Sequence, residues 1–453
     1  MQDSIYTLVP PLVAILVALW RKNAIEALAV GLLLTGLMQM NFAPIEGVVA
    51  SGSVLLSVFQ GVSNQRIIIF SLLIGALLML IKHSGGVNAF ISSLNERNLV
   101  KNQRQASLLP SLIGTSIFTD SNLSMFTAGI ASQNLFDKFG LSRARLAFLI
   151  DSTCSPVSIL FLINGWGAYV LGLLDGYQLT DTVGILIETI AYNFYPIIVL
   201  IMVYYTAVTN KVYGPLKYAS SKIVETSEQQ VISNGKARYM LVPMVLIVLV
   251  TLLLLYITGE GDLRRGSGSF AVMWAVIFSF LILCVMLLLD KVFNIKQIVQ
   301  HSVTGIKNLL PAVIVLVLSF AFGDAVKAFG TGTYVSGIMS VEVAQIGLAP
   351  LLFITAGIMA FATGTSWGTF AILIPIAVPL SIETGLPPAF LVAAVLGGGV
   401  FGDHSSPISD STIVASIASG CEHLEHVKTQ LPYTLVAGLI TICLYIVTAV
   451  ILF

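Results

Sequence analysis

The stretch GGGVFGDHSSPISDSTI, Gly397–Ile413, decides how the rest of this 453-residue chain is interpreted. It holds two carboxylates, a histidine, five hydroxyl side chains and a proline inside an otherwise apolar region. Polar groups without partners are costly in hydrocarbon, so this stretch must line protein or water. A polar, glycine-loosened and proline-interrupted segment is typical of the binding site of a secondary transporter. The alternative is a buried structural kink whose hydrogen bonds are all satisfied.

The composition indicates a membrane protein. Hydrophobic residues make up 57% of the chain and charged residues 10%, with a mean hydropathy of +0.95. A soluble domain carries about 25% charged residues. The formal net charge is zero, which gives no electrostatic basis for nucleic-acid binding. The four cysteines show no metal-ligand spacing and predict no disulfides, and no pairing of a nucleophile with a base suggests an enzyme.

A helix needs about 20 apolar residues to cross a bilayer, and this criterion predicts an all-α polytopic membrane protein. Two apolar stretches, 106–136 and 345–382, are interrupted near their middles by polar and glycine residues. Each is too short for two spans and too interrupted for one, which predicts re-entrant hairpins buried in protein. Ten further segments are predicted to span the membrane: 5–20, 24–41, 66–83, 146–174, 183–208, 239–258, 269–289, 309–327, 388–418 and 431–453.

The two halves of the chain resemble each other. GTS at Gly114 recurs at Gly364, and CSPVS at Cys154 is matched by SSPIS at Ser405, both about 250 residues later. Each half holds five predicted spans, a hairpin and a broken helix, and an odd number of crossings inverts the second half relative to the first. The predicted units are a first repeat at 1–209, a cytoplasmic linker at 210–238 and a second, inverted repeat at 239–453. With the linker inside, most lysines and arginines also lie inside, as the positive-inside rule requires.

The second half is predicted to contain a broken helix. Gly402 weakens one half-helix, and Ser406 followed by Pro407 favours a restart, with serine as N-cap and proline at the first helical position. The gap would expose oxygen ligands that suit a small hard cation. Asp410 has an alternative as a plain first-turn cap, and His404 either carries a proton or donates a fixed hydrogen bond. The candidate ligands in this break are Asp403, His404, Ser405, Ser406 and Asp410.

The first half repeats this pattern around Asp151, where Ser155 and Pro156 predict a second helix restart. An acid in the middle of an apolar span is a functional candidate by default, although a purely structural role is the alternative. The hairpin tips are predicted to face the breaks. The first tip offers Thr115, Ser116, Thr119, Asp120, Ser121 and Asn122, and the second offers Thr363, Thr365, Ser366 and Thr369, without an acid.

The two predicted sites are therefore chemically unequal. The first pairs Asp120 with Asp151, and the second pairs Asp403 with Asp410. Two carboxylates that share a site can bind either protons or one cation, which is the minimal chemistry of an exchanger. The sodium candidates are these four acids, with Na⁺ and H⁺ as transported or coupling ions and no other cofactor.

Other polar residues carry weaker interpretations. Asn164 and Trp166 follow the first predicted restart and suggest the lining of a path. Glu188 and Asp324 lie near span ends, where an ordinary interface position is equally favoured. The run Glu422–His426 superficially suggests a metal cluster, but its place at a span end favours a solvated cytoplasmic face.

GDHSSPISDSTIVAS (Gly402–Ser416), followed by HVKTQLPYTLVAG (His426–Gly438), resembles the signature of the NhaC-type sodium/proton antiporter family within the ion transporter superfamily. The resemblance implies a cation-coupled exchanger in the bacterial inner membrane, a homodimer, and an elevator motion of hairpins and broken helices against a scaffold. It also implies ion-site roles for Asp403, Ser405, Ser406 and Asp410.

Two functions are left open by these residues. The first is sodium/proton antiport, in which both cations compete for the carboxylates. The second is cation-coupled transport of a small organic acid or amino acid, held by the amide groups of half-helices. A chamber for one dehydrated ion would support the first, and a chamber of about 100 Å³ or more, several waters in size, would support the second.

Overall fold

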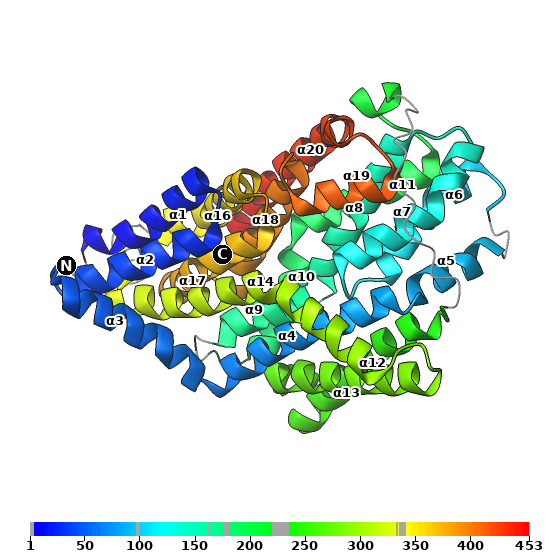
Figure 1. Ribbon diagram of the computed structural model, residues 1–453. Helices are drawn as coiled ribbons and strands as arrows, with labels where there is room; N and C mark the ends of the chain where they lie inside the picture. Colours follow the sequence, from blue (N-terminus) through cyan, green and yellow to red (C-terminus); the bar gives the residue numbers. More distant parts are fainter. Residues whose placement is uncertain are drawn as a thin grey trace.

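The computed structural model describes residues 4–96, 100–161, 163–175, 177, 179, 181–219, 235–331, 334 and 341–452. Every regular element in these residues is a helix, and nine helices among them are long and apolar enough to cross a membrane (Figure 1). The predicted all-α, polytopic class is confirmed. Most of the predicted linker, 220–234, lies outside the described residues, so the boundaries of the two repeats stay a prediction.

The first half contains α1 (Val9–Arg21), α2 (Ala24–Gln39), α3 (Pro44–Ser57), α4 (Val62–His83), α5 (Gly86–Glu96), α6 (Gln103–Ser116), α7 (Ser121–Lys138), α8 (Arg143–Leu160), α9 (Gly165–Asp175), α10 (Thr182–Tyr192), α11 (Phe194–Thr209) and a short 3₁₀ helix, η3 (Gly214–Tyr218). The second half contains α12 (Arg238–Thr258), α13 (Gly268–Leu289), α14 (Ile295–Phe329), α16 (Val341–Thr363), α17 (Ser366–Thr384), α18 (Pro388–Ser405), α19 (Asp410–Ser419) and α20 (His423–Leu452).

Both predicted hairpins form, as the helix pairs α6–α7 and α16–α17. Asp120 ends the first tip as the N-cap of α7 and accepts a hydrogen bond from the Leu123 amide at 2.7 Å. Gly364 makes the second tip with φ +70°, a conformation that glycine adopts without strain. The expected length of the second hairpin is wrong, because α16 and α17 are each long and apolar enough to span a membrane.

The second predicted helix break is confirmed, but it lies a few residues later than expected. α18 continues to Ser405, and Ser409, rather than Ser406, caps α19 by accepting from the Ser411 amide at 3.1 Å. Pro407 lies in the gap between the two helices. The order of a hairpin followed by a broken helix is thus present in both halves of the chain.

The predicted restart at Ser155–Pro156 is wrong, because α8 runs through both residues to Leu160. Proline removes one helical hydrogen bond and crowds the preceding turn. Nearly all of α8 is buried against α6, α7, α11 and α19, and we attribute its continuity to this packing. The helix ends instead about one turn later, at Leu160, with Phe161 as its C-cap.

Asn164 sets the position of the first break. Its side-chain oxygen accepts from the amides of Trp166 and Gly167 at 2.9 and 3.0 Å, which caps the start of α9. Its side-chain nitrogen donates to the carbonyls of Ser158 and Phe161, both at 2.7 Å, and so satisfies the end of α8. The side-chain amide of Asn164 therefore caps both the end of α8 and the start of α9.

Two helices, α3 and α5, were not predicted, and α14 was predicted only over its second half. α3 was missed because its 14 residues fall short of a membrane span. It packs on α2 where a side chain on Gly36 would lie 2.2 Å from the Ser51 hydroxyl, so glycine permits the contact. α14 begins earlier than predicted because Asn294 and Gln297 form a capping box at its start.

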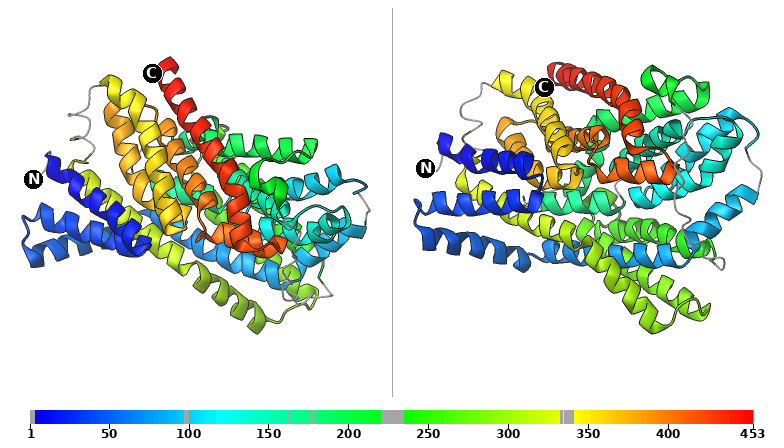
Figure 2. Two further views of the ribbon diagram at one scale, coloured as in Figure 1. Left: turned by 90° about the horizontal axis from the view of Figure 1, so that it is seen from above. Right: turned by 45° about the horizontal axis from the view of Figure 1, so that its top comes forward.

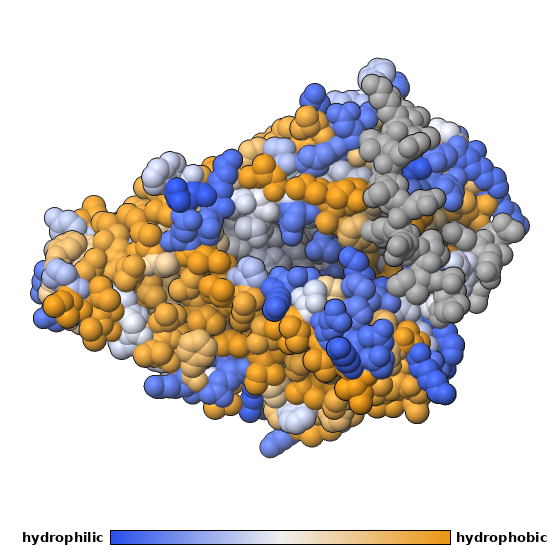
Figure 3. Space-filling model, viewed as in Figure 1, coloured by the Kyte–Doolittle hydropathy of each residue, from blue (hydrophilic) through white to orange (hydrophobic). Residues whose placement is uncertain are grey.

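Helices from the two halves cross at the centre of the molecule. α4 packs on α14, where added side chains at Gly75 and Gly305 would meet the opposite backbone at 2.6 and 2.2 Å. α1–α3 lie with α16 and α17 at one end, and α5–α7 lie at the other (Figures 1 and 2). Apolar residues cover much of one face of the molecule, over α1–α3 and along the edge formed by α12 and α13 (Figure 3).

Candidate functional site

A polar chamber of about 590 Å³ lies where both hairpin tips meet the second helix break. Its walls come from the start of α2, the middle of α14, both tips, and the residues around the α18–α19 gap. The residues that matter chemically are Lys22, Asn23, Asp120, Asn122, Trp166, Asn308, Thr365, Ser366, Trp367, Asp403, Asp410 and Ser411. Three carboxylates thus line one chamber.

Asp403 is the most enclosed of these acids, with 2% of its surface exposed. Three hydroxyl groups donate to its carboxylate: Ser409 at 2.6 Å, Ser411 at 3.3 Å and Ser366 at 3.4 Å. Ser366 begins α17, whereas Ser409 and Ser411 lie at the start of α19. The carboxylate of Asp403 therefore joins the second hairpin tip to the second helix break.

Asp120 and Asp410 reach the chamber from the starts of two helices. Asp120 caps α7, and Asp410 occupies the first turn of α19, as predicted. A carboxylate is stabilised at a helix N-terminus by the helix dipole. The structure brings both of them together with Asp403, so the pairing of Asp120 with Asp151 is wrong.

Lys22 is the charged chamber residue that was not predicted; Asn23, Asn308 and Trp367 also line the chamber without having been predicted. Lys22 ends α1 with φ 52° and is exposed at the chamber wall. Lys22 belongs to the loop between α1 and α2, far along the chain from both predicted breaks. The available signal was its position directly before Asn23, a residue type that favours the start of a helix. Asn23 caps α2 through two hydrogen bonds.

The predicted ligands Ser405 and Ser406 do not line the chamber. The Ser405 hydroxyl donates to the Phe401 carbonyl at 2.8 Å and to the Thr434 hydroxyl at 2.9 Å. The Ser406 hydroxyl donates to the Phe361 carbonyl at 2.7 Å, which binds the break to the end of α16. Their hydroxyls are occupied in holding helices together because α18 continues past the point where it was expected to end.

Asp151 and His404 also lie outside the chamber, in a fully buried cluster between α8, α18 and α20. The Asp151 carboxylate accepts from Gln430 at 2.7 Å and contacts the His426 Nε2 atom at 3.1 Å. The His404 Nε2 atom lies 3.0 Å from the Asp151 backbone oxygen. Ser155, one helical turn from Asp151, is buried, and its hydroxyl has no partner among the described residues.

The interpretation of Glu422–His426 as a solvated face is wrong for His426. Glu422 is exposed, but His426 is completely buried against Asp151. The run starts α20, and its last residue turns to the inside of the bundle. Of the weaker candidates, Trp166 lines the chamber, whereas Glu188 is exposed 3.9 Å from Arg264 and Asp324 is exposed on α14.

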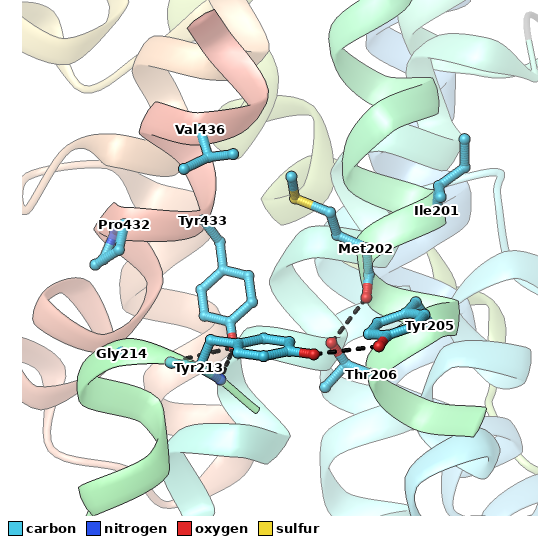
Figure 4. Close-up of a pocket in the computed structure, with 9 residues that line it drawn as sticks. All are labelled: Ile201, Met202, Tyr205, Thr206, Tyr213, Gly214, Pro432, Tyr433 and Val436. Atoms are coloured by element: carbon cyan, nitrogen blue, oxygen red, sulfur yellow. Dashed lines mark hydrogen bonds between the residues drawn. The ribbon is translucent and has the colours of Figure 1, made fainter. Parts of the chain in front are cut away.

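A second cavity, of about 400 Å³, has a different character (Figure 4). It lies between α11, η3 and α20, and its polar groups are mainly the hydroxyls of three tyrosines. Tyr205 and Tyr213 bond to each other at 3.1 Å, and Tyr433 accepts from the Tyr213 amide at 2.7 Å. No acid lines this cavity among the described residues, so the chamber is the better cation site.

Comparison with known sequences identifies the family of this chain. Residues 157–450, more than half of the chain, match the Na⁺/H⁺ antiporter family. The chain belongs to this family. Members of an antiporter family are transporters rather than enzymes, so this chain is a multi-pass membrane antiporter.

Three similar proteins define the extent of the relationship. This antiporter is 30% identical to an uncharacterised protein of Haemophilus influenzae, over 98% of this chain and 91% of that protein. It is 34% identical to the malate-2H⁺/Na⁺-lactate antiporter of Bacillus subtilis, over 34% of this chain and 33% of that protein. The solved structure of MtrF from Neisseria gonorrhoeae, described among antimetabolite efflux pumps, covers 90% of this chain and 85% of its own with a TM-score of 0.61. At 14% identity, that likeness shows a shared fold alone.

Proposed function

We propose that this antiporter exchanges Na⁺ for H⁺ at Asp120, Asp403 and Asp410. The observation that carries the proposal is the convergence of these three carboxylates on one chamber, where Lys22 is the single basic residue among the lining residues. Such an excess of negative groups attracts cations. A carboxylate can hold a proton or share its oxygens with Na⁺, so the two cations compete for it.

The hydroxyls around Asp403 suit this competition. Ser366, Ser409 and Ser411 are oxygen ligands as well as hydrogen-bond donors, so they can turn from the carboxylate to a cation. When Na⁺ binds to the carboxylates, the proton that they held is released. When Na⁺ leaves, a proton restores the neutral state before the site moves.

We propose that access alternates by an elevator motion, in which both hairpins and both broken helices move against α2, α4 and α14. Each tip is bonded to its own break, which supports joint movement. Asn164 donates to the Phe118 carbonyl at 2.8 Å, and Ser406 donates to the Phe361 carbonyl at 2.7 Å. The inverted orientation of the two halves is part of this proposal.

A second candidate is cation-coupled exchange of a small organic solute, and the size of the chamber favours it. A volume of about 590 Å³ far exceeds the space of one dehydrated ion. Lys22 offers a partner for a carboxylate, while Trp166 and Trp367, with ring centres 5.9 Å apart, offer apolar surface. In this candidate the acids retain Na⁺ or H⁺ as the coupling ion.

The test is transport by purified protein in sealed liposomes with a pH-sensitive dye inside. Sodium alone should dissipate an imposed pH gradient, and Asp403→Asn should abolish this response. Asp181→Asn is the matched control, since Asp181 caps α10 away from the chamber and should leave exchange intact.

The outcomes separate the two candidates. A response to sodium that requires an added amino acid or carboxylate would establish the second candidate in place of the first. Unchanged exchange in Asp403→Asn would refute the chamber as the site in either case.

We also propose that the antiporter is a homodimer in the bacterial inner membrane, as the family signature implies. Membrane fractionation and the mass of the detergent-solubilised particle test these two points. A purely monomeric particle that is fully active after reconstitution at one copy per vesicle would contradict the dimer.

A further inference from the structure

A buried cluster of titratable groups has no part in the chamber. It consists of Asp151 on α8, His404 on α18, and His426 with Gln430 on α20. All four side chains are at least 99% buried, and none is among the chamber-lining residues. Three helices thus place one acid and two imidazoles together in a dry interior.

The hydrogen bonds fix where protons sit on the imidazoles. A backbone carbonyl can only accept, so the His404 Nε2 atom must donate to the Asp151 carbonyl at 3.0 Å. An ionised carboxylate also only accepts, so the His426 Nε2 atom donates to Asp151 at 3.1 Å. Both imidazoles then carry hydrogen on Nε2. The Nδ1 atom of His404 accepts from the Tyr195 hydroxyl at 3.4 Å, whereas the Nδ1 atom of His426 has no partner among the described residues and can accept a further proton.

Gln430 holds the cluster in this arrangement. Its amide nitrogen donates to the Asp151 carboxylate at 2.7 Å and to the His404 carbonyl at 2.9 Å. Its oxygen accepts from the Ser152 hydroxyl at 3.4 Å. Gln430 is therefore a positioning residue that joins α20 to both α8 and α18.

The charge balance of the cluster calls for a proton. With Asp151 ionised and both histidines neutral, the dry interior holds one uncompensated negative charge, which is costly. Among the described residues, the other titratable groups that interact with the cluster are Cys154 on α8, Tyr195 on α11, Asp403 on α18 and Asp410 on α19. None of these groups supplies a positive charge, whereas one added proton makes the cluster neutral.

We propose that Asp151 and His426 form an enclosed proton site that is separate from the carboxylate chamber and binds no Na⁺. Each presents a buried atom without a hydrogen-bond partner among the described residues, Oδ1 of Asp151 and Nδ1 of His426. One proton is shared between the Asp151 carboxylate and the His426 imidazole, and His404 remains a donor to the Asp151 backbone carbonyl. Na⁺ is disfavoured because Gln430 and His426 direct N–H donors, rather than the oxygen ligands that Na⁺ requires, toward the Asp151 carboxylate. The neighbouring positions of Asp403 and His404 on α18 link this site to the chamber without merging the two.

The direct test is nuclear magnetic resonance of reconstituted protein with ¹⁵N-labelled histidine, of which the chain has five, together with infrared detection of protonated carboxyl groups. Near neutral pH, the spectra should show one of two signals: an imidazolium in the ¹⁵N spectrum or a protonated carboxyl group in the infrared spectrum. Whichever signal is present should disappear in Asp151→Asn. Sodium should leave that signal unchanged. Two neutral imidazoles with no carboxyl band attributable to Asp151, or a signal that sodium removes, would overturn the proposal.

Transport by His426→Gln gives a second readout, because glutamine keeps a donor toward Asp151 but does not take up a proton. We expect the pH midpoint of exchange to move to more acidic values by about one unit, with the KM for sodium unchanged. His423→Gln is the matched control, since His423 bonds to Ser416 and Pro407 outside the cluster. An unchanged pH profile in His426→Gln would contradict the site, and the spectroscopic test stands even if the chamber is not the sodium site.

Discussion

Asp151 and Asp403 show how far a buried acid can be interpreted from sequence. Both were recognisable as candidates, because an acid within an apolar run requires a reason. The side-chain partners of Asp151 were not predictable, because they lie on α20, more than 270 positions away. Asp403, in contrast, finds Ser409 and Ser411 within its own segment. Asp403 and Asp410 therefore share a site as predicted, whereas His404, Ser405 and Ser406 of the same break lie outside it. The pairing predicted for Asp151 was wrong.

Asn164 is the residue whose removal should disturb the first break most. Asn164→Ala loses the cap of α9 and the bonds to the end of α8, which we expect to cost about 2 kcal/mol. The measurement is a lower Tm in detergent, together with slower exchange. Asn88→Ala is the control, since the Asn88 side chain makes none of the hydrogen bonds found among the described residues. Equal Tm values for the two variants would contradict the capping role.

At the scale of elements, the hairpins were predictable and the exact helix ends were not. Polar and glycine residues at 114–124 and 362–370 correctly marked two turns. Pro156 and Pro407 occur in matching motifs, yet only Pro407 lies in a gap, because α8 is enclosed by neighbouring helices. Tertiary packing thus decides which proline interrupts a helix, and that information is absent from a local pattern.

The contact between the second tip and the second break can be tested with two glycines. Gly364 and Gly385 both have positive φ, so alanine strains the backbone at each. An added Cβ at Gly364 would lie 2.5 Å from the Ile408 carbonyl oxygen, whereas nothing lies within 4 Å at Gly385. Gly364→Ala should therefore reduce exchange at least about tenfold beyond the effect of Gly385→Ala, a barrier difference of about 1.4 kcal/mol. Equal loss in both variants would show that the tip does not need this contact.

At the scale of the whole molecule, the elevator proposal predicts which helices may be joined without loss of exchange. An added Cβ at Gly368 would lie 2.7 Å from that of Ala24, and one at Gly129 would lie 2.8 Å from that of Ala418. Both pairs permit a disulfide after a small separation of the helices. The pair 24–368 joins the second hairpin to α2, against which it moves in this mechanism. The pair 129–418 joins α7 to α19, and these two helices move together.

In a background without the four native cysteines, the disulfide between positions 24 and 368 should stop exchange, and a reductant should restore it. The disulfide between positions 129 and 418 should leave exchange nearly intact. Vesicle transport before and after reduction, with cross-linking followed by gel mobility, gives both results. Full exchange with the 24–368 disulfide formed would exclude movement of the second hairpin against α2.

The chamber takes Asp120 from the first half of the chain and Asp403 and Asp410 from the second. Neither half alone supplies all three acids, so the two halves depend on each other for a complete site. Mutations that restore growth to a strain impaired at Asp120 are accordingly to be sought in the distal part of the gene, around codons 403–411, rather than beside the original lesion.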